Sequence, residues 1–210
     1  MRVGKRPLYL VTDRLGIEEE AFLCRLELAC QGGVDLVQLR EKSLDSRHYF
    51  QLAQQVKAIT DQYELPLIID DRLDIALAVN AAGVHLGQQD IPVDVARRLL
   101  GPRKIIGATT KTVRQAQLAV RAGADYLGVG AIFPTTTHVK TVHTSVATLA
   151  AIQAAVPIPV YAIGGLNSTN VTAVQPAKVA GVAVVSAIMK APHPDLAAQA
   201  LRQKVLTVVR

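Results

Sequence analysis

Two kinds of strand-like segment alternate along the chain, and this alternation constrains the fold more than any other feature. One kind begins at a proline or a basic residue, as in Pro7-Leu-Tyr-Leu-Val and Pro66-Leu-Ile-Ile. The other begins after a small residue and a glycine, as in Gly33-Val-Asp-Leu-Val and Gly83-Val-His-Leu. The later members of the two series are Lys104-Ile-Ile-Gly, Gly123-Ala-Asp-Tyr-Leu-Gly-Val, Pro159-Val-Tyr-Ala-Ile and Gly181-Val-Ala-Val-Val. The interleaved series predict eight strands.

The segments between the strands have helical periodicity. Apolar residues recur at steps of three and four in two clear cases, Tyr49, Leu52, Val56, Ile59 and Tyr63, and Ala197, Leu201, Val205 and Val208. Gly33 and Gly123 stand where the end of a helix favours a left-handed residue. Near-continuous apolar strands that alternate with helices indicate a parallel sheet covered by helices. Eight such units predict a single (β/α)8 TIM barrel over residues 1–210, with a doubly wound sheet as the alternative.

Net charge and hydropathy limit the classes of binding partner that this chain can have. The chain has 23 Lys and Arg against 17 Asp and Glu, a net charge of +6. Aromatic residues make up only 4% and no basic run is interleaved with them, so a nucleic-acid groove is disfavoured. A small polyanionic substrate is a better explanation of the positive excess. The apolar residues come in short runs instead of one span of about twenty, so we expect no membrane partner.

Two further observations bear on location. The first residues lead directly into the strand-like Pro7 segment and not into a signal-peptide apolar region. Cys24 and Cys30 lie six residues apart in one predicted helix, on different faces, and therefore cannot easily form a disulfide. We expect a soluble, cytoplasmic protein, and the oligomeric state stays open between a monomer and a homo-oligomer.

Acidic residues follow two successive predicted strands. Leu67-Ile-Ile leads into Asp70 and Asp71, and the strand at residues 83–86 leads into Gly87-Gln-Gln-Asp90. Neighbouring parallel strands end at the same edge of a sheet, so Asp71 and Asp90 are expected to converge. A carboxylate pair of this kind suits Mg²⁺, which binds one or two carboxylates together with substrate phosphate oxygens. The alternatives are a helix N-cap for Asp71 and a turn role for Asp90.

Arg40 and Lys42 form a second candidate group, after the second predicted strand. Being two residues apart on an extended segment, they point the same way and can hold one anion between them. The alternative is a solvated loop in which they pair with Glu41. The catalytic groups of TIM barrels follow the strands, which favours the functional interpretation.

The last two strands end in residues typical of phosphate binding. Gly164 and Gly165 follow the seventh strand, and Val185 and Ser186 follow the eighth. Glycines let backbone N–H groups approach an anion, and the loops after strands seven and eight are the usual phosphate site of a TIM barrel. The long Thr-rich loop at 131–145 follows the sixth strand on the same face, and loops of this length are often functional.

These motifs together resemble the thiamine-phosphate synthase family over essentially the whole chain. The motifs are QLREK at 38–42, DDRLDIA at 70–76, GVHLGQQDIP at 83–92, GADYLGVG at 123–130, FPTTT at 133–137, AIGG at 162–165 and GVAVVSAI at 181–188. The resemblance implies a transferase that joins 4-amino-2-methyl-5-pyrimidinylmethyl diphosphate to 4-methyl-5-(2-phosphoethyl)thiazole. The products are thiamine phosphate and diphosphate, formed through a dissociative pyrimidinylmethyl cation.

The resemblance also implies roles for matching residues. Mg²⁺ is bound by Asp71 and Asp90, and Arg40, Lys42 and His138 are catalytic. The pyrimidine diphosphate is bound by Gln38, Leu39, Arg40, Glu41, Lys42, Asp70, Thr109 and His138. The thiazole phosphate is bound by Thr135, Thr136, Thr137, Gly165, Val185 and Ser186.

This chain departs from the family pattern at three of those positions. Asp70 stands where the family usually has Asn, Thr109 where it has Ser, and His138 where it has Lys. Threonine keeps the hydroxyl, but Asp70 adds a negative charge near a diphosphate. We expect activity to fall as His138 loses its proton.

Two other functions fit a similar barrel. A related thiazole tautomerase has, by resemblance, a catalytic histidine where this chain has Lys111, and the retained Asp71 and Asp90 favour the synthase. A non-catalytic regulator that binds phosphate ligands is the second alternative.

Overall fold

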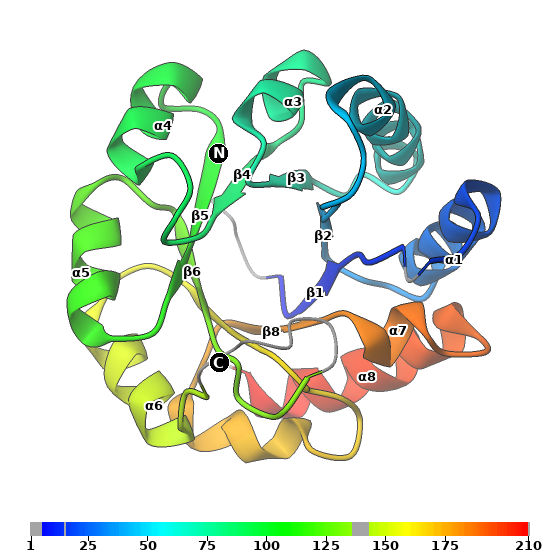
Figure 1. Cartoon of the computed structure of the whole chain (residues 1–210). Coiled ribbons are helices and arrows are strands. Elements are labelled where there is room, and N and C mark those ends of the chain that lie inside the picture. Colours follow the sequence, from blue (N-terminus) through cyan, green and yellow to red (C-terminus); the bar gives the residue numbers. More distant parts are fainter. Residues whose placement is uncertain (1–5, 15, 136–142, 210) are drawn as a thin grey trace.

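The chain folds into a closed barrel of eight parallel strands surrounded by helices (Figure 1). This computed structural model describes residues 6–14, 16–135 and 143–209. Each strand pairs with the next in sequence order, and β8 closes the barrel against β1. The strands are β1 Leu8–Val11, β2 Leu36–Leu39, β3 Leu67–Asp70, β4 Gly83–Leu86, β5 Ile105–Thr110, β6 Tyr126–Val129, β7 Val160–Ile163 and β8 Gly181–Val184. The predicted TIM barrel is confirmed, and the doubly wound alternative is excluded.

The helices form the outer ring in Figure 1. They are α1 Glu19–Gln31, α2 Ser46–Gln62, α3 Leu73–Ala78, α4 Val93–Leu100, α5 Val113–Arg121, α6 Val146–Ala155, α7 Ser186–Met189 and α8 Pro194–Val208, with the 3₁₀-helix η1 Val171–Ala177 between β7 and β8. Pro176 lies inside η1, where its missing N–H disfavours a longer α-helix. None of the helices built from described residues is both long and apolar enough to cross a membrane.

The second strand follows Gly33 as expected and begins at Leu36. Gly33 itself has φ 90° and lies in the turn that follows α1. Asp35 then ties the turn to β1: its N–H donates to Leu8 O at 2.8 Å, and its carboxylate accepts from Leu8 N at 2.9 Å. Gly123 has φ 99°, so both glycines adopt the left-handed conformation that the sequence predicts.

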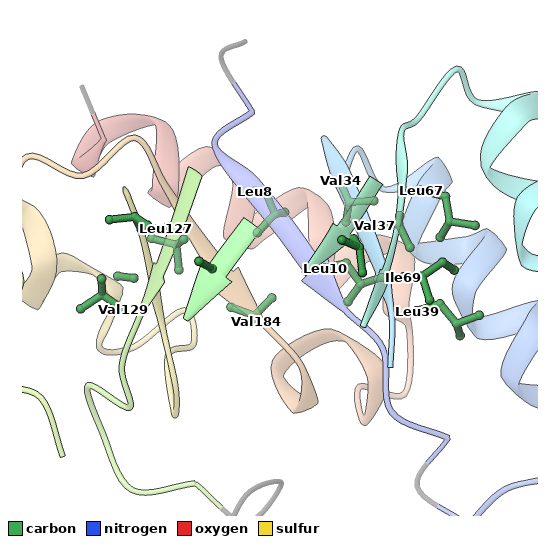
Figure 2. Close-up of a cluster of buried hydrophobic side chains, with 14 of the residues drawn as sticks. Leu8, Leu10, Val34, Val37, Leu39, Leu67, Ile69, Leu127, Val129 and Val184 are labelled. Carbon is green, nitrogen blue, oxygen red and sulfur yellow. The ribbon is translucent and has the colours of Figure 1, made fainter. Parts of the chain in front are cut away.

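Strand residues alternate between two separate cores. Leu8, Leu10 and Val37 belong to the outer core between strands and helices, which Figure 2 shows together with residues of β3 and β6. Tyr9 and Leu36, their immediate neighbours, belong to a smaller core inside the barrel. This period of two means that a residue's position in its strand decides whether it can reach the barrel mouth.

Candidate active site

A pocket of about 650 Å³ lies at the carboxyl ends of the strands. All eight strands or the loops that follow them contribute to its wall. The charged residues that border it are Arg40, Lys42, Asp70, Asp71, Asp90 and Lys111. A TIM barrel places its ligand-binding groups at this end.

The predicted cation pair lies in the pocket and contacts Asp70. Lys42 Nζ is 2.8 Å from Asp70 Oδ2, and Arg40 Nε is 4.0 Å from the same oxygen. Lys42 also contacts the Asp71 carboxylate. The alternative of a loop paired only through Glu41 does not describe this geometry, since both cations reach carboxylates of the next strand.

Asp70 is buried at the end of β3, with 8% of its surface exposed. Burial and, after it, the neighbouring Asp71 raise the pKa of its carboxyl to about 6, while Lys42 and Arg40 act in the opposite direction. The carboxyl therefore depends on the two cations to remain ionised near neutral pH.

Asp71 turns the chain sharply at the barrel mouth. Its φ is 57°, a conformation that Asp tolerates better than most residues, and its N–H donates to His85 O at 2.9 Å. It does not cap a helix, since Arg72 is the N-cap of α3 and contributes no side-chain cap. A strained residue at a pocket rim is a candidate functional residue.

Asp90 does serve the turn after β4, because its Oδ2 accepts from Gly87 N at 2.6 Å. It also meets Asp71: burial first, and then a side-chain hydrogen bond with Asp71, raises the pKa of the Asp90 carboxyl. The two carboxylates therefore converge as the strand order predicts.

This carboxylate pair is compatible with Mg²⁺. Two carboxylates in contact repel each other unless a proton or a cation lies between them. In the described ranges no group of three or more His, Cys, Asp or Glu side chains is arranged to hold a metal. A two-carboxylate site that leaves the remaining positions to water and phosphate oxygens fits the ordinary preference of Mg²⁺.

The opposite side of the mouth is formed by glycines. Gly164 and Gly165 have φ 100° and 64°, and a Cβ on Gly165 would lie 2.7 Å from the Cβ of Phe133. The loop after β6 packs on this turn, since Phe133 N donates to Gly164 O at 3.0 Å. Gly165, Val185 and Ser186 all border the pocket. The predicted phosphate residues that the structure describes thus lie together.

Some predicted site residues are placed differently from the rest. Leu39 is fully buried and packs toward the helices, and Glu41 folds onto its own loop by accepting from Ser43 N at 2.8 Å. Neither side chain borders the pocket as Gln38 and Arg40 do, because alternate residues of β2 face opposite ways. Their role in binding stays a prediction.

Thr135 borders the pocket at the start of the Thr-rich loop. Thr136, Thr137 and His138 fall outside the described residues, so their predicted roles stay predictions.

Lys111 borders the pocket, although the sequence analysis used it only to argue against the tautomerase and assigned it no role in the site. It follows Thr109 by two residues, so the same alternation that pairs Arg40 with Lys42 predicts that both face the barrel mouth. In the described part of the chain no carboxylate lies within ion-pair distance of Lys111, in contrast to Arg40 and Lys42.

A second set of polar side chains lies at the pocket floor. His85 Nδ1 is 3.0 Å from Tyr126 Oη, and His85 Nε2 is 2.9 Å from Thr109 Oγ1. Burial lowers the pKa of His85 to about 4, which leaves the ring neutral. Tyr126 Oη is 2.7 Å from Tyr9 Oη, and Gln38 Nε2 donates to Tyr9 Oη at 2.6 Å. His85 is therefore a core residue and a neighbour of the site at once.

Comparison with known proteins agrees with this geometry. Residues 8–188 match the family described as "Thiamine monophosphate synthase". The chain is 54% identical over 202 residues to a thiamine-phosphate synthase of Lacticaseibacillus paracasei, covering 96% of this chain and 95% of the relative. It is 52% identical to thiamine-phosphate synthase 2 of Streptococcus pneumoniae, with 96% of each chain covered.

A solved structure gives the same result. The thiamine phosphate pyrophosphorylase of Pyrococcus furiosus superposes with a TM-score of 0.88 at 37% identity, over 99% of both chains. At this identity and coverage the likeness extends beyond the shared barrel. The chain belongs to the thiamine-phosphate synthase family.

Proposed function

We propose that this protein joins 4-amino-2-methyl-5-pyrimidinylmethyl diphosphate to 4-methyl-5-(2-phosphoethyl)thiazole, releasing thiamine phosphate and diphosphate. Family membership supports the reaction, and one observation in the structure supports its location. A cation pair, a carboxylate pair and a glycine turn border a single pocket. Such a pocket matches two substrates that both carry phosphate groups.

The diphosphate is assigned to the β2–β4 side of the pocket. Arg40 and Lys42 would bind its oxygens, and Lys42 would have to exchange part of its contact with Asp70 and Asp71 for the ligand. Asp71 and Asp90 would hold Mg²⁺. When bound, Mg²⁺ would supply positive charge to the phosphate oxygens of the leaving group.

The proposed reaction is dissociative. The methylene C–O bond breaks first, its electron pair stays on the departing diphosphate, and the thiazole nitrogen then donates its lone pair to the pyrimidinylmethyl cation. Arg40 and Lys42 would neutralise the negative charge that grows on the leaving oxygens. The glycine turn would fix the thiazole phosphate, and so bring the nucleophile to the reacting carbon.

The thiazole phosphate is assigned to the β7–β8 side. Gly165 is crowded by Phe133, so only a glycine permits a close approach to the backbone there. Val185 and Ser186 border the same side of the pocket. Thr135, Thr136 and Thr137, in the loop after β6, would complete the binding site for this phosphate.

The test is product formation from the two substrates by the purified full chain, with Mg²⁺ and with EDTA. We expect thiamine phosphate only with Mg²⁺. Binding of both substrates without product would favour the regulator, and product that is unaffected by EDTA would contradict the metal assignment. A pH profile of the same assay tests His138, since replacement by lysine should flatten its alkaline fall. Cytoplasmic location and oligomeric state stay predictions.

A further inference from the structure

Five polar side chains form one continuous chain of hydrogen bonds through the barrel interior. In order, the members are Gln38, Tyr9, Tyr126, His85 and Thr109. The two end members, Gln38 of β2 and Thr109 of β5, both border the pocket, as do Tyr9 and His85 among the inner members. The three inner members lie below the charged rim and are at most 8% exposed.

The chain can be polarised in only two ways. Gln38 Nε2 donates to Tyr9 Oη, so the Tyr9 proton is free to go to Tyr126 Oη. Tyr126 then donates to His85 Nδ1, which makes His85 the Nε2–H tautomer and a donor to Thr109 Oγ1. Reversing one of the two inner links would leave a buried hydroxyl proton without an acceptor, which costs about 1–3 kcal/mol. Reversing only the Gln38 link would leave two hydroxyl oxygens facing each other with no proton between them, and reversing only the Thr109 link would leave the His85 ring without a proton. All links therefore point the same way or reverse together.

This polarity defines what the pocket floor offers a ligand. With Gln38 Nε2 used inside the chain, its Oε1 is available as an acceptor, and none of the described side chains or N–H groups donates to it. With Thr109 Oγ1 accepting from His85, its own proton is available as a donor. The floor thus presents an acceptor on the β2 side and a donor on the β5 side.

The neighbouring residues leave room for the hydrogen-bonded side chains and hold them in place. Glycines on β5 and β6 provide the room for it: a Cβ on Gly107 would lie 2.5 Å from His85 Nδ1, and one on Gly128 would lie 3.1 Å from His85 Cε1. The rings of Tyr9 and Tyr126 pack edge to face with centroids 5.9 Å apart. Packing on this scale holds the hydroxyls in place.

We propose that Tyr9, Tyr126 and His85 are positioning residues that fix Gln38 as a hydrogen-bond acceptor and Thr109 as a donor toward the ligand. The pocket then selects a ring that donates an N–H on the β2 side and accepts at a ring nitrogen on the β5 side. An aminopyrimidine has both groups. The identity of that ring rests on the proposed function, whereas the polarity of the chain does not.

The first experiment measures the polarity without any ligand. Long-range ¹H–¹⁵N spectra of the ¹⁵N-labelled full chain report which histidine nitrogen carries the proton, and His85→Gln identifies the His85 signals. We expect a neutral His85 protonated at Nε2. A ring protonated at Nδ1, or at both nitrogens, at pH 7.5 would overturn the proposal.

The second experiment measures the consequence for recognition. The probes are 2-methyl-5-(phosphooxymethyl)pyrimidines with a 4-amino or a 4-oxo group, since the oxo form exchanges donor and acceptor and neither carries a diphosphate leaving group. We expect the unaltered chain to bind the amino form about a hundredfold more tightly. Tyr126→Phe should reduce this ratio to about tenfold or less and abolish the His85 tautomer preference.

A matched control comes from the same aromatic cluster. Tyr161 packs on Tyr9 with ring centroids 5.5 Å apart, but its buried hydroxyl has no hydrogen-bond partner in the described structure. Tyr161→Phe should leave both the tautomer and the binding ratio unchanged. An unchanged ratio in Tyr126→Phe would remove the positioning role.

If Tyr126→Phe does not fold, Tyr9→Phe provides the second variant. This substitution removes the acceptor of Gln38 Nε2, so Gln38 is no longer held in one orientation and the binding ratio should fall. Tyr126 can still donate to His85 Nδ1, so His85 should keep its Nε2 proton. A Tyr9→Phe chain with the full ratio would equally overturn the proposal. Failure of the unaltered chain to bind either probe or to form product would refute the proposed function and leave the tautomer result standing.

Discussion

The two sides of the pocket mouth present different chemistry. On the β2–β4 side, the groups that face a ligand are charged side chains, and Arg40 and Lys42 both pair with Asp70. On the β7–β8 side they are glycines and small residues, and Gly165 is crowded by Phe133. One side should therefore be sensitive to the loss of a charge, and the other to the gain of a methyl group.

Removing the Asp71 carboxylate should have the largest effect. We expect Asp71→Ala to lose Mg²⁺-dependent turnover by about a thousandfold or more, since a metal contributes several kcal/mol to such a step. The measurement is initial rate against Mg²⁺ concentration, with circular dichroism to establish that the fold is intact. Asp94→Ala is the matched control, because Asp94 is exposed and pairs with Arg98 on α4. Full activity in Asp71→Ala would reject the metal assignment.

Adding a methyl group to the other side should come second. Gly165→Ala places a Cβ against Phe133 and at φ 64°, so the turn must shift. We expect the KM for the thiazole phosphate to rise about a hundredfold, the size of a few kcal/mol, with little change in the KM for the pyrimidine diphosphate. Gly101→Ala is the control, since Gly101 has φ 71° but nothing within 4 Å of its Cβ position. Equal changes in both KM values would argue against a divided pocket.

Lys111 tests whether the charged side extends to β5. Because no carboxylate in the described residues neutralises it, Lys111→Ala should raise the KM for the pyrimidine diphosphate about tenfold, as expected for one charged contact. Arg114→Ala removes the same charge three residues later, from an exposed position that does not border the pocket. Similar effects of the two substitutions would mean that only net charge matters.

The last prediction concerns stability and separates the rim from the floor. Burial raises the pKa of Asp70 to about 6 and lowers the pKa of His85 to about 4. Between about pH 4 and pH 6 the folded state holds the Asp70 proton that the unfolded state has lost, so this group makes stability fall as pH rises. In the same range the unfolded state binds the His85 proton, so His85 makes stability rise with pH.

The two slopes oppose each other at up to about 1.4 kcal/mol per pH unit each. In Asp70→Asn only the His85 contribution remains, so the free energy of unfolding should rise with pH over this range. In His85→Gln only the Asp70 contribution remains, so the free energy of unfolding should fall as pH rises. Urea unfolding at pH 4, 5 and 6 measures both. Parallel curves for the two variants would contradict the assigned pKa directions.

Much of the site could be predicted because the barrel converts position in a strand into position at the mouth. Asp71 and Asp90 follow neighbouring strands, and Arg40 and Lys42 are two residues apart, so strand order and alternation are enough to predict that all four converge. The same rule predicts Lys111 from Thr109. It also explains why Leu39 and Glu41, which alternate with Gln38 and Arg40, direct their side chains away from the pocket.

The sequence by itself determined the architecture of this protein and the end of the barrel that carries the site. The eight alternating units and the residues that follow each strand are patterns formed by residues close together in the sequence, so they can be predicted without knowing the fold. Only the tertiary structure decided which groups touch across the barrel: that Lys42 pairs with Asp70, and that His85 of β4 links Tyr126 of β6 to Thr109 of β5. Those contacts depend on side chains that meet across the interior from different strands, at distances and angles that closure of the sheet sets.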